Sequence, residues 1–206
     1  MKATFRLCIA ALALLFDAGS ASAEPVTYHM TGIVTEVSGT LVSSLFSVGD
    51  SFVLDLTVER TTVPLPDKQE AAATYLNAGT SLVFDVGSWQ CSGASDNLIV
   101  VMNDFPVPQD DGPDQFDYDA TGLSTQPLGS IIATEFRLTL GDLAGDALSS
   151  VEIPRTMPEP SSWETRTFSI AFAEGLTLGN VAGTIVTSAT PARSASWGAI
   201  KNLYRQ

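Results

Sequence analysis

The sequence has few positively charged residues and a single histidine. Ten Lys and Arg stand against 23 Asp and Glu among its 206 residues, which gives a formal net charge of −13 at pH 7. Proteins that bind nucleic acid use clustered cations to displace the counterions of the phosphates, and the body of the chain, residues 24–188, has no such cluster. We therefore expect no nucleic-acid partner.

Long apolar runs are also scarce. The most pronounced run, Leu7–Phe16, is about half the length of a membrane span of roughly 20 residues, so we expect no transmembrane span. It follows Lys2 and Arg6 and precedes the small residues Ala21-Ser22-Ala23, a pattern typical of a secretory signal peptide. The sequence predicts a signal peptide over residues 1–23, with cleavage after Ala23, and a secreted or cell-surface location.

Cysteine is nearly absent. The chain has two cysteines, and Cys8 lies in the predicted leader. Cys91 would therefore be the only cysteine after cleavage and could form no intramolecular disulfide. A catalytic thiol needs a nearby base, and the chain offers only His29. We therefore expect Cys91 to be a small buried residue at a strand end.

Period-two alternation of apolar and polar residues dominates the rest of the chain. The clearest case is Phe52–Val58, where every second residue is apolar, and Gly and Pro turns separate several similar segments. Many short strands without intervening helices predict an all-β antiparallel sandwich or jelly roll over residues 24–188. Its predicted inward-facing residues are Phe52, Leu54, Leu56, Phe84, Phe136, Leu138, Leu140, Phe168, Ile170 and Phe172.

The order of these segments resembles a known family. The runs Tyr28–Gly39, Phe46–Phe52 and Ala73–Gly87, followed by Leu138–Asp142 and Phe168–Phe172, are similar to exported bacterial β-domains that commonly carry a PEP-CTERM sorting tail. The resemblance covers roughly residues 26–188 and implies an exported, surface-associated or matrix-associated protein. It implies no chemistry, because members of that family mostly lack an assigned activity.

The end of the chain departs from that family. Pro158-Glu159-Pro160 resembles the start of a sorting tail, but an alternating, charged strand follows it where an apolar helix is expected. Residues 189–206 instead predict a linker and a short, basic amphipathic helix. This segment would be either a sorting or partner-binding tail that contacts an export or anchoring component, or a helix that frays or docks on the domain. Its residues are Trp197, Ile200, Lys201, Leu203, Tyr204 and Arg205.

An acidic segment is the first candidate for metal binding. Carboxylate oxygens on a Gly/Pro-rich loop are ligands that Ca²⁺ accepts, although the spacing is not that of an EF-hand. The alternative is a solvated acidic loop with no cofactor. The six candidate ligands are Asp104, Asp110, Asp111, Asp114, Asp117 and Asp119.

The sequence favours a protein that is not an enzyme. His29 lies in an alternating strand, and the chain contains neither the Gly-x-Ser-x-Gly motif nor the clustered carboxylates of jelly-roll glucanases. Trp89 and Trp163 are candidates for sugar-stacking platforms, with core packing as the alternative. We therefore expect an exported β-sandwich with a structural or adhesive role at the cell surface or in extracellular matrix. The alternatives are a carbohydrate-binding module that contacts extracellular polysaccharide and, with less support, a glycan hydrolase.

Overall fold

The computed structural model describes residues 23–66, 70–93, 96–104, 112–125, 131–174 and 177–189. Over these residues the protein is all-β, with two 3-10 turns, η1 (Val42–Ser44) and η2 (Pro160–Ser162). Within these residues, no helix is long and apolar enough to cross a bilayer. The strands are β1 (Pro25–Ser38), β2 (Ser51–Glu59), β3 (Ala72–Leu76), β4 (Gly79–Val86), β5 (Trp89–Ser92), β6 (Asp96–Met102), β7 (Asp114–Thr121), β8 (Ser124–Thr125), β9 (Ile131–Asp142), β10 (Thr165–Glu174) and β11 (Thr177–Ala189).

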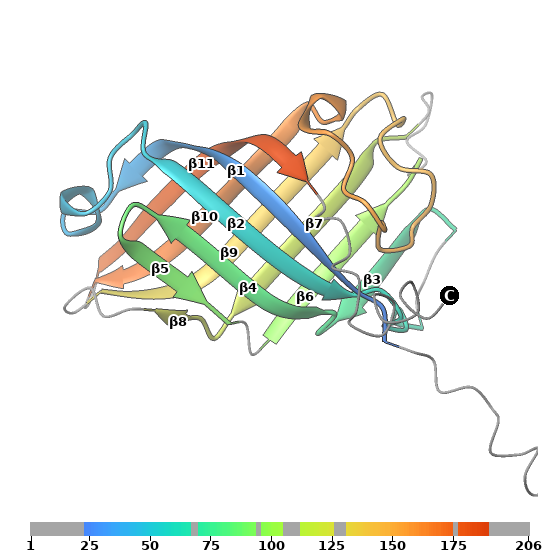
Figure 1. Cartoon of the computed structure of the whole chain (residues 1–206), viewed down its shortest axis with the longest axis horizontal. Helices are drawn as coiled ribbons and strands as arrows, with labels where there is room; N and C mark the ends of the chain where they lie inside the picture. The colour runs from blue at the N-terminus through green and yellow to red at the C-terminus, as the bar shows by residue number, and fades with distance from the viewer. Residues whose placement is uncertain are drawn as a thin grey trace, which may run out of the picture.

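All eleven strands belong to one antiparallel sheet. Their order is β3-β6-β7-β9-β10-β11-β1-β2-β4-β5-β8, so the first strand lies in the middle and pairs with the last. Figure 1 shows the sheet curling so that β1, β2, β4 and β5 cross in front of β7, β9 and β10. The all-β antiparallel prediction is confirmed. The sandwich or jelly roll is not confirmed, because the two facing halves are parts of one continuous sheet.

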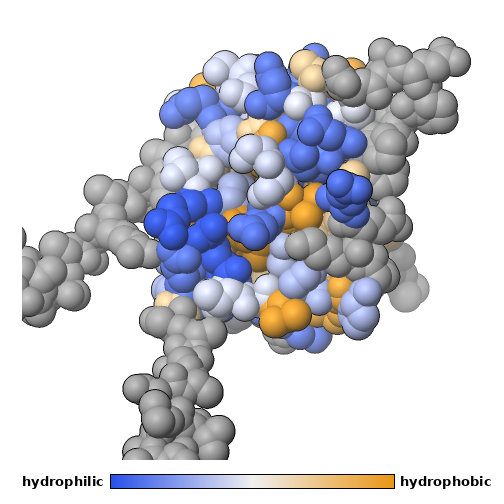
Figure 2. Space-filling model, turned by 90° about the vertical axis from the view of Figure 1, so that its right-hand side faces the viewer, coloured by the Kyte–Doolittle hydropathy of each residue, from blue (hydrophilic) through white to orange (hydrophobic). Residues whose placement is uncertain are grey.

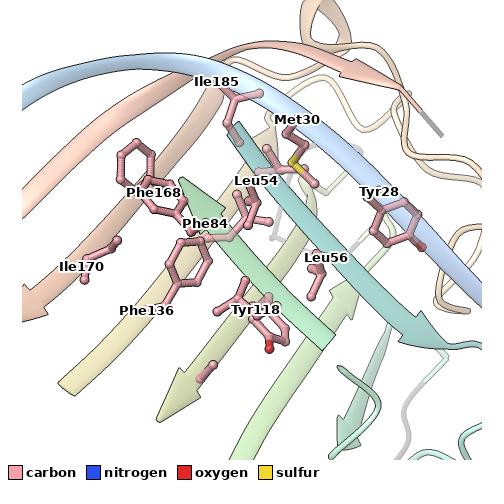
Figure 3. Packing of buried hydrophobic residues seen from close by; sticks show 14 of the residues in the cluster. Tyr28, Met30, Leu54, Leu56, Phe84, Tyr118, Phe136, Phe168, Ile170 and Ile185 are labelled. Carbon is pink, nitrogen blue, oxygen red and sulfur yellow. The ribbon is translucent and has the colours of Figure 1, made fainter. Parts of the chain in front are cut away.

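The alternating residues fill the inside of the curl. All ten predicted inward-facing residues are at most 2% exposed. The ring of Phe168 lies 4.4 Å from that of Phe52 and 4.9 Å from that of Phe84, measured between centroids, so the two halves of the sheet are in direct contact. Figure 3 shows Phe84, Phe136 and Phe168 packed together between the strands that carry them. Burial of these large side chains drives the curl, since a flat sheet would leave one apolar face in water.

Loops cover both ends of the curled sheet. At one end the segment 143–164 places Val151, Ile153 and Met157 in the core. The hydroxyl of Tyr75 donates a hydrogen bond to the carbonyl of Val151 at 2.9 Å, and the hydroxyl of Tyr28 donates to the carbonyl of Pro154. At the other end Phe46, just after η1, packs against Trp89 and Phe172.

Two predicted segments lie outside the described residues. One is the leader up to residue 22, and the other is the short C-terminal helix within residues 190–206. The predicted tail, Trp197, Ile200, Lys201, Leu203, Tyr204 and Arg205, belongs to the second of these segments.

Candidate functional site

The acidic segment is divided by the structure. Asp114, at the start of β7, is fully buried, and its carboxylate accepts hydrogen bonds from the backbone N–H of Asp104 at 3.0 Å and of Leu148 at 2.6 Å. Leu148 belongs to the segment that covers the end of the sheet. Asp114 therefore fastens that segment to the turn after β6.

Two other aspartates face the opposite side of the same strand. Asp117 accepts a hydrogen bond from Gln115. Burial raises the pKa of Asp117 above its ordinary value, although hydrogen bonds from Thr139 and Gln115 act in the opposite direction. Asp119 forms an ion pair with Arg137 at 2.7 Å. These carboxylates cannot share an ion with Asp114, because successive odd and even residues of a strand point to opposite faces.

The calcium hypothesis stays a prediction. Asp110 and Asp111 lie outside the described residues. Within the described ranges, no three His, Cys, Asp or Glu side chains gather closely enough to hold a metal ion.

Asp142 is a buried carboxylate to which the sequence alone assigns no role. Its carboxylate accepts hydrogen bonds from the backbone N–H groups of Ala144, Asp146 and Ala147 at 2.9 to 3.1 Å. Burial alone would raise the pKa of Asp142, but these N–H groups outweigh it and hold the pKa below its ordinary value. An aspartate that follows a glycine at the end of a strand is typical of a turn in which the carboxylate accepts hydrogen bonds from the next backbone N–H groups, so Gly141-Asp142 was the sequence signal for this arrangement.

The two tryptophans are core residues. Trp89 is 5% exposed and packs against Phe46 and Phe172, and Trp163 is 2% exposed. A sugar-stacking platform needs an open ring face, which neither indole has, so that interpretation does not hold for these residues. The alternative of core packing describes both. The sequence could not distinguish the two cases, because a strand-end tryptophan is common in either.

Cys91 is buried as expected. Its side chain is fully inaccessible, and burial raises the pKa of the Cys91 thiol to about 12. The thiolate, which is the nucleophilic form, is therefore negligible near neutral pH.

The outer face of the front half of the sheet is the strongest candidate for a functional surface. Its side chains are mostly polar, and they lie in three rows across β1, β2 and β4. Two of these rows continue onto β5, and one of those two ends at Ser124 of β8. We call this surface the polar face. Its residues are Thr27, His29, Thr31, Val53, Asp55, Thr57, Ser81, Val83, Asp85, Gln90, Ser92 and Ser124.

Hydrogen bonds between neighbouring strands hold these side chains in place. The hydroxyls of Thr27 and Thr57 lie 2.9 Å apart, and Nδ1 of His29 lies 2.6 Å from Oδ1 of Asp55. The side-chain amide of Gln90 donates to Asp85 at 2.8 Å. Each row therefore presents oriented polar groups.

Two valines and two aspartates form a checkerboard at the centre of the polar face. Val53 pairs with Asp85 across β2 and β4, and two residues along the same strands Asp55 pairs with Val83. All four side chains are half-buried. The surface thus alternates small apolar patches with hydrogen-bond acceptors at the spacing of neighbouring strands, roughly 4.8 Å.

An open cavity of about 250 Å³ lies on the segment that covers the sheet end. Arg60 and Arg155 contribute to its lining, and both pair with the carboxylate of Glu24. Figure 2 looks onto this end of the molecule, where strongly hydrophilic residues lie beside apolar ones. Because Glu24 already pairs with both arginines, the cluster holds the start of β1 in place and is a poor anion site.

Comparisons with protein-family models, with curated proteins and with solved structures each return no match. The likeness to exported bacterial β-domains therefore stays an expectation from the sequence.

Proposed function

We propose that this protein is an exported, non-enzymatic protein with a structural or adhesive role at the cell surface or in extracellular matrix. In this role the polar face contacts a neutral extracellular polysaccharide. The checkerboard of Val53, Asp85, Asp55 and Val83 carries the proposal.

The chemistry of this surface suits a sugar polymer. Pyranose rings present C–H patches between hydroxyl groups, and the half-buried valines offer small apolar contacts of similar size. The carboxylates of Asp55 and Asp85 accept hydrogen bonds from hydroxyls, and bonds to a charged acceptor are stronger than neutral ones. A neutral polymer fits better than an acidic one, because the protein itself carries a net charge of −13.

The scaffold supports this role by keeping the surface rigid. The inward side chains of the same strands, among them Phe52 and Phe84, belong to the packed aromatic core. A preorganised surface loses little conformational entropy on binding. Repeated weak contacts along a polymer then add through multivalency.

Export is supported by the leader pattern before Ala23 and by the resemblance to exported β-domains. The carbohydrate-binding alternative shares the polar face with the structural role. Trp89 and Trp163 do not contribute to it, because both are buried.

The test is a pull-down of the purified chain, residues 24–206, with insoluble neutral polysaccharides and with extracellular polymer from the host. The double variant Asp55→Asn and Asp85→Asn should lower the bound fraction at least fivefold, with an unchanged melting temperature. The matched control is Asp119→Asn, which removes a half-buried carboxylate with its own side-chain partner from the outer face of β7 and should bind as the parent does.

Two results would contradict the proposal. One is equal retention of the double variant and the parent. The other is recovery of the protein only from the cytosolic fraction of the host, which would remove export and the polysaccharide partner together.

A further inference from the structure

Four charged residues surround the start of β1. The backbone nitrogen of Glu24 lies 2.7 Å from Oε1 of Glu59. The side-chain carboxylate of Glu24 pairs through one oxygen with Arg60 and through the other with Arg155, each at 2.7 Å. Figure 1 shows this start of β1 beside the end of β2.

The position of Glu24 is fixed by its main chain as well. The N–H of Arg60 donates to the carbonyl of Glu24 at 3.2 Å, and the next residue, Pro25, pairs with Glu59 in the sheet. Arg60 is itself anchored, because its Nε donates to the carbonyl of Ile153 at 2.9 Å and its side chain is only 15% exposed. The amide nitrogen of Glu24 is thus held against one particular carboxylate.

Glu59 is an anion with hydrogen-bond donors but without a described cation. Hydrogen bonds from the hydroxyl and N–H of Thr61, and from the N–H of Glu24, lower the pKa of Glu59. Among the ion pairs of the described residues, the two nearby arginines both go to Glu24. Within the described ranges, the remaining hydrogen bond to Oε1 of Glu59 comes from the backbone nitrogen of Glu24.

We propose that cleavage between Ala23 and Glu24 supplies the missing cation and makes this cluster a docking site for the new N-terminus. This inference rests on the proposed export. Hydrolysis of the peptide bond by a processing peptidase consumes one water, leaves the carboxylate on Ala23, and leaves on Glu24 an amine that takes up a proton. Ala23 is small and exposed, so the bond is accessible.

The consequence is that the processed chain is more stable than its precursor. In the precursor a neutral amide donates a single hydrogen to Glu59. After cleavage a charged ammonium with three hydrogens occupies the same place, and charge-assisted hydrogen bonds are roughly twice as strong as neutral ones. The fold is therefore completed at the moment of processing, which suits a protein that functions outside the cell.

The first part of the test is N-terminal sequencing of the protein recovered from the outside of the host, which should start at Glu24. A different cleavage position in an exported protein overturns this inference and leaves the proposed function standing. Retention of the intact leader overturns both.

The second part compares two purified chains, one that begins at Glu24 and one that retains Ser22 and Ala23. The chain that begins at Glu24 should melt higher by roughly 2 to 4 °C at pH 7. Glu59→Gln keeps the amide hydrogen bond but removes the charge, so in that background the difference should disappear. Glu36→Gln, at an exposed position of β1, is the matched control and should preserve it.

The pH dependence separates the ammonium from a merely structural hydrogen bond. A carboxylate partner raises the folded-state pKa of the amine, so its contribution is complete below the ordinary value of about 8 and is lost as the pH rises further. The melting difference should therefore vanish near pH 10. Equal melting temperatures at pH 7, or a difference that Glu59→Gln leaves intact, overturn the inference without affecting export.

Discussion

Asn97 on β6 bridges to the backbone of Gly79 on β4, although these strands belong to opposite halves of the sheet order. Its side-chain oxygen accepts from the N–H of Gly79 at 2.8 Å, and its amide donates to the carbonyl of Gly79 at 2.9 Å. A β-carbon on Gly79 would lie 2.7 Å from the ring of Tyr118, so this close approach requires glycine. The pair joins the two halves where the sheet curls.

The first prediction concerns this bridge. Asn97→Ala should lower the free energy of unfolding by about 2–4 kcal/mol, because it removes both side-chain hydrogen bonds to the buried backbone of Gly79. Urea unfolding measures the loss. Asn180→Ala, on β11, is the control and should stay within about 0.5 kcal/mol of the parent. A loss below about 1 kcal/mol for Asn97→Ala would show that water or neighbouring groups replace the bridge.

The second prediction concerns the aromatic core. Phe168 is 2% exposed and its ring contacts those of Phe52, Phe84 and Phe136. Phe168→Ala should cost about 3–5 kcal/mol, the sum of lost transfer free energy and the cavity left behind. The same unfolding measurement applies. Leu178→Ala, at a position 80% exposed, should be nearly neutral, and similar losses for both variants would contradict the close packing of Phe168.

The third prediction concerns Asp142 and acid. The folded-state pKa of Asp142 is depressed, so its stabilising contribution is complete above the ordinary value near 4 and is lost as the pH falls through the folded value. Asp142→Asn should therefore unfold about 1–3 kcal/mol more easily than the parent at pH 7, and the difference should narrow toward pH 3. Glu159→Gln, at an exposed position, should change neither value. A difference independent of pH would show that charge is not involved.

The fourth prediction concerns Cys91. Because burial suppresses its thiolate, a thiol reagent at pH 8 should label almost none of the native chain 24–206 within an hour and one thiol per chain in guanidinium. Absorbance of the released chromophore follows the reaction. Rapid labelling of the native protein would mean that the strand carrying Cys91 opens readily.

The fifth prediction concerns calcium. The described carboxylates face different sides of β7 and already accept hydrogen bonds or pair with Arg137, so millimolar Ca²⁺ should leave the melting temperature unchanged. A chelator serves as the reverse control. A rise that chelator reverses would support a calcium site, because a ligand that binds only the folded state stabilises it.

Residue alternation was enough to predict the strands and the inward face. Phe52, Leu54 and Leu56 are buried because side chains of a strand alternate between two faces, and that property is local. The same alternation places Asp114 on one face of the strand and Asp117 and Asp119 on the other, so their separation could be predicted from the sequence. The burial of Trp89 could not be predicted, since both core packing and sugar stacking suit a large aromatic residue at a strand end.

By itself, the sequence determined the class of fold, the core residues and the burial of Cys91, because these depend on composition and local periodicity. Only the tertiary structure decided that the strands form one curled sheet, that Asp55 and Val83 share the polar face, and that Glu24 meets Glu59 and Arg155. Those relationships join residues from 28 to 131 positions apart in the chain. Local propensity does not predict such pairs, because strand order and register arise from long-range hydrogen bonding and from how the whole set of apolar faces can be buried together.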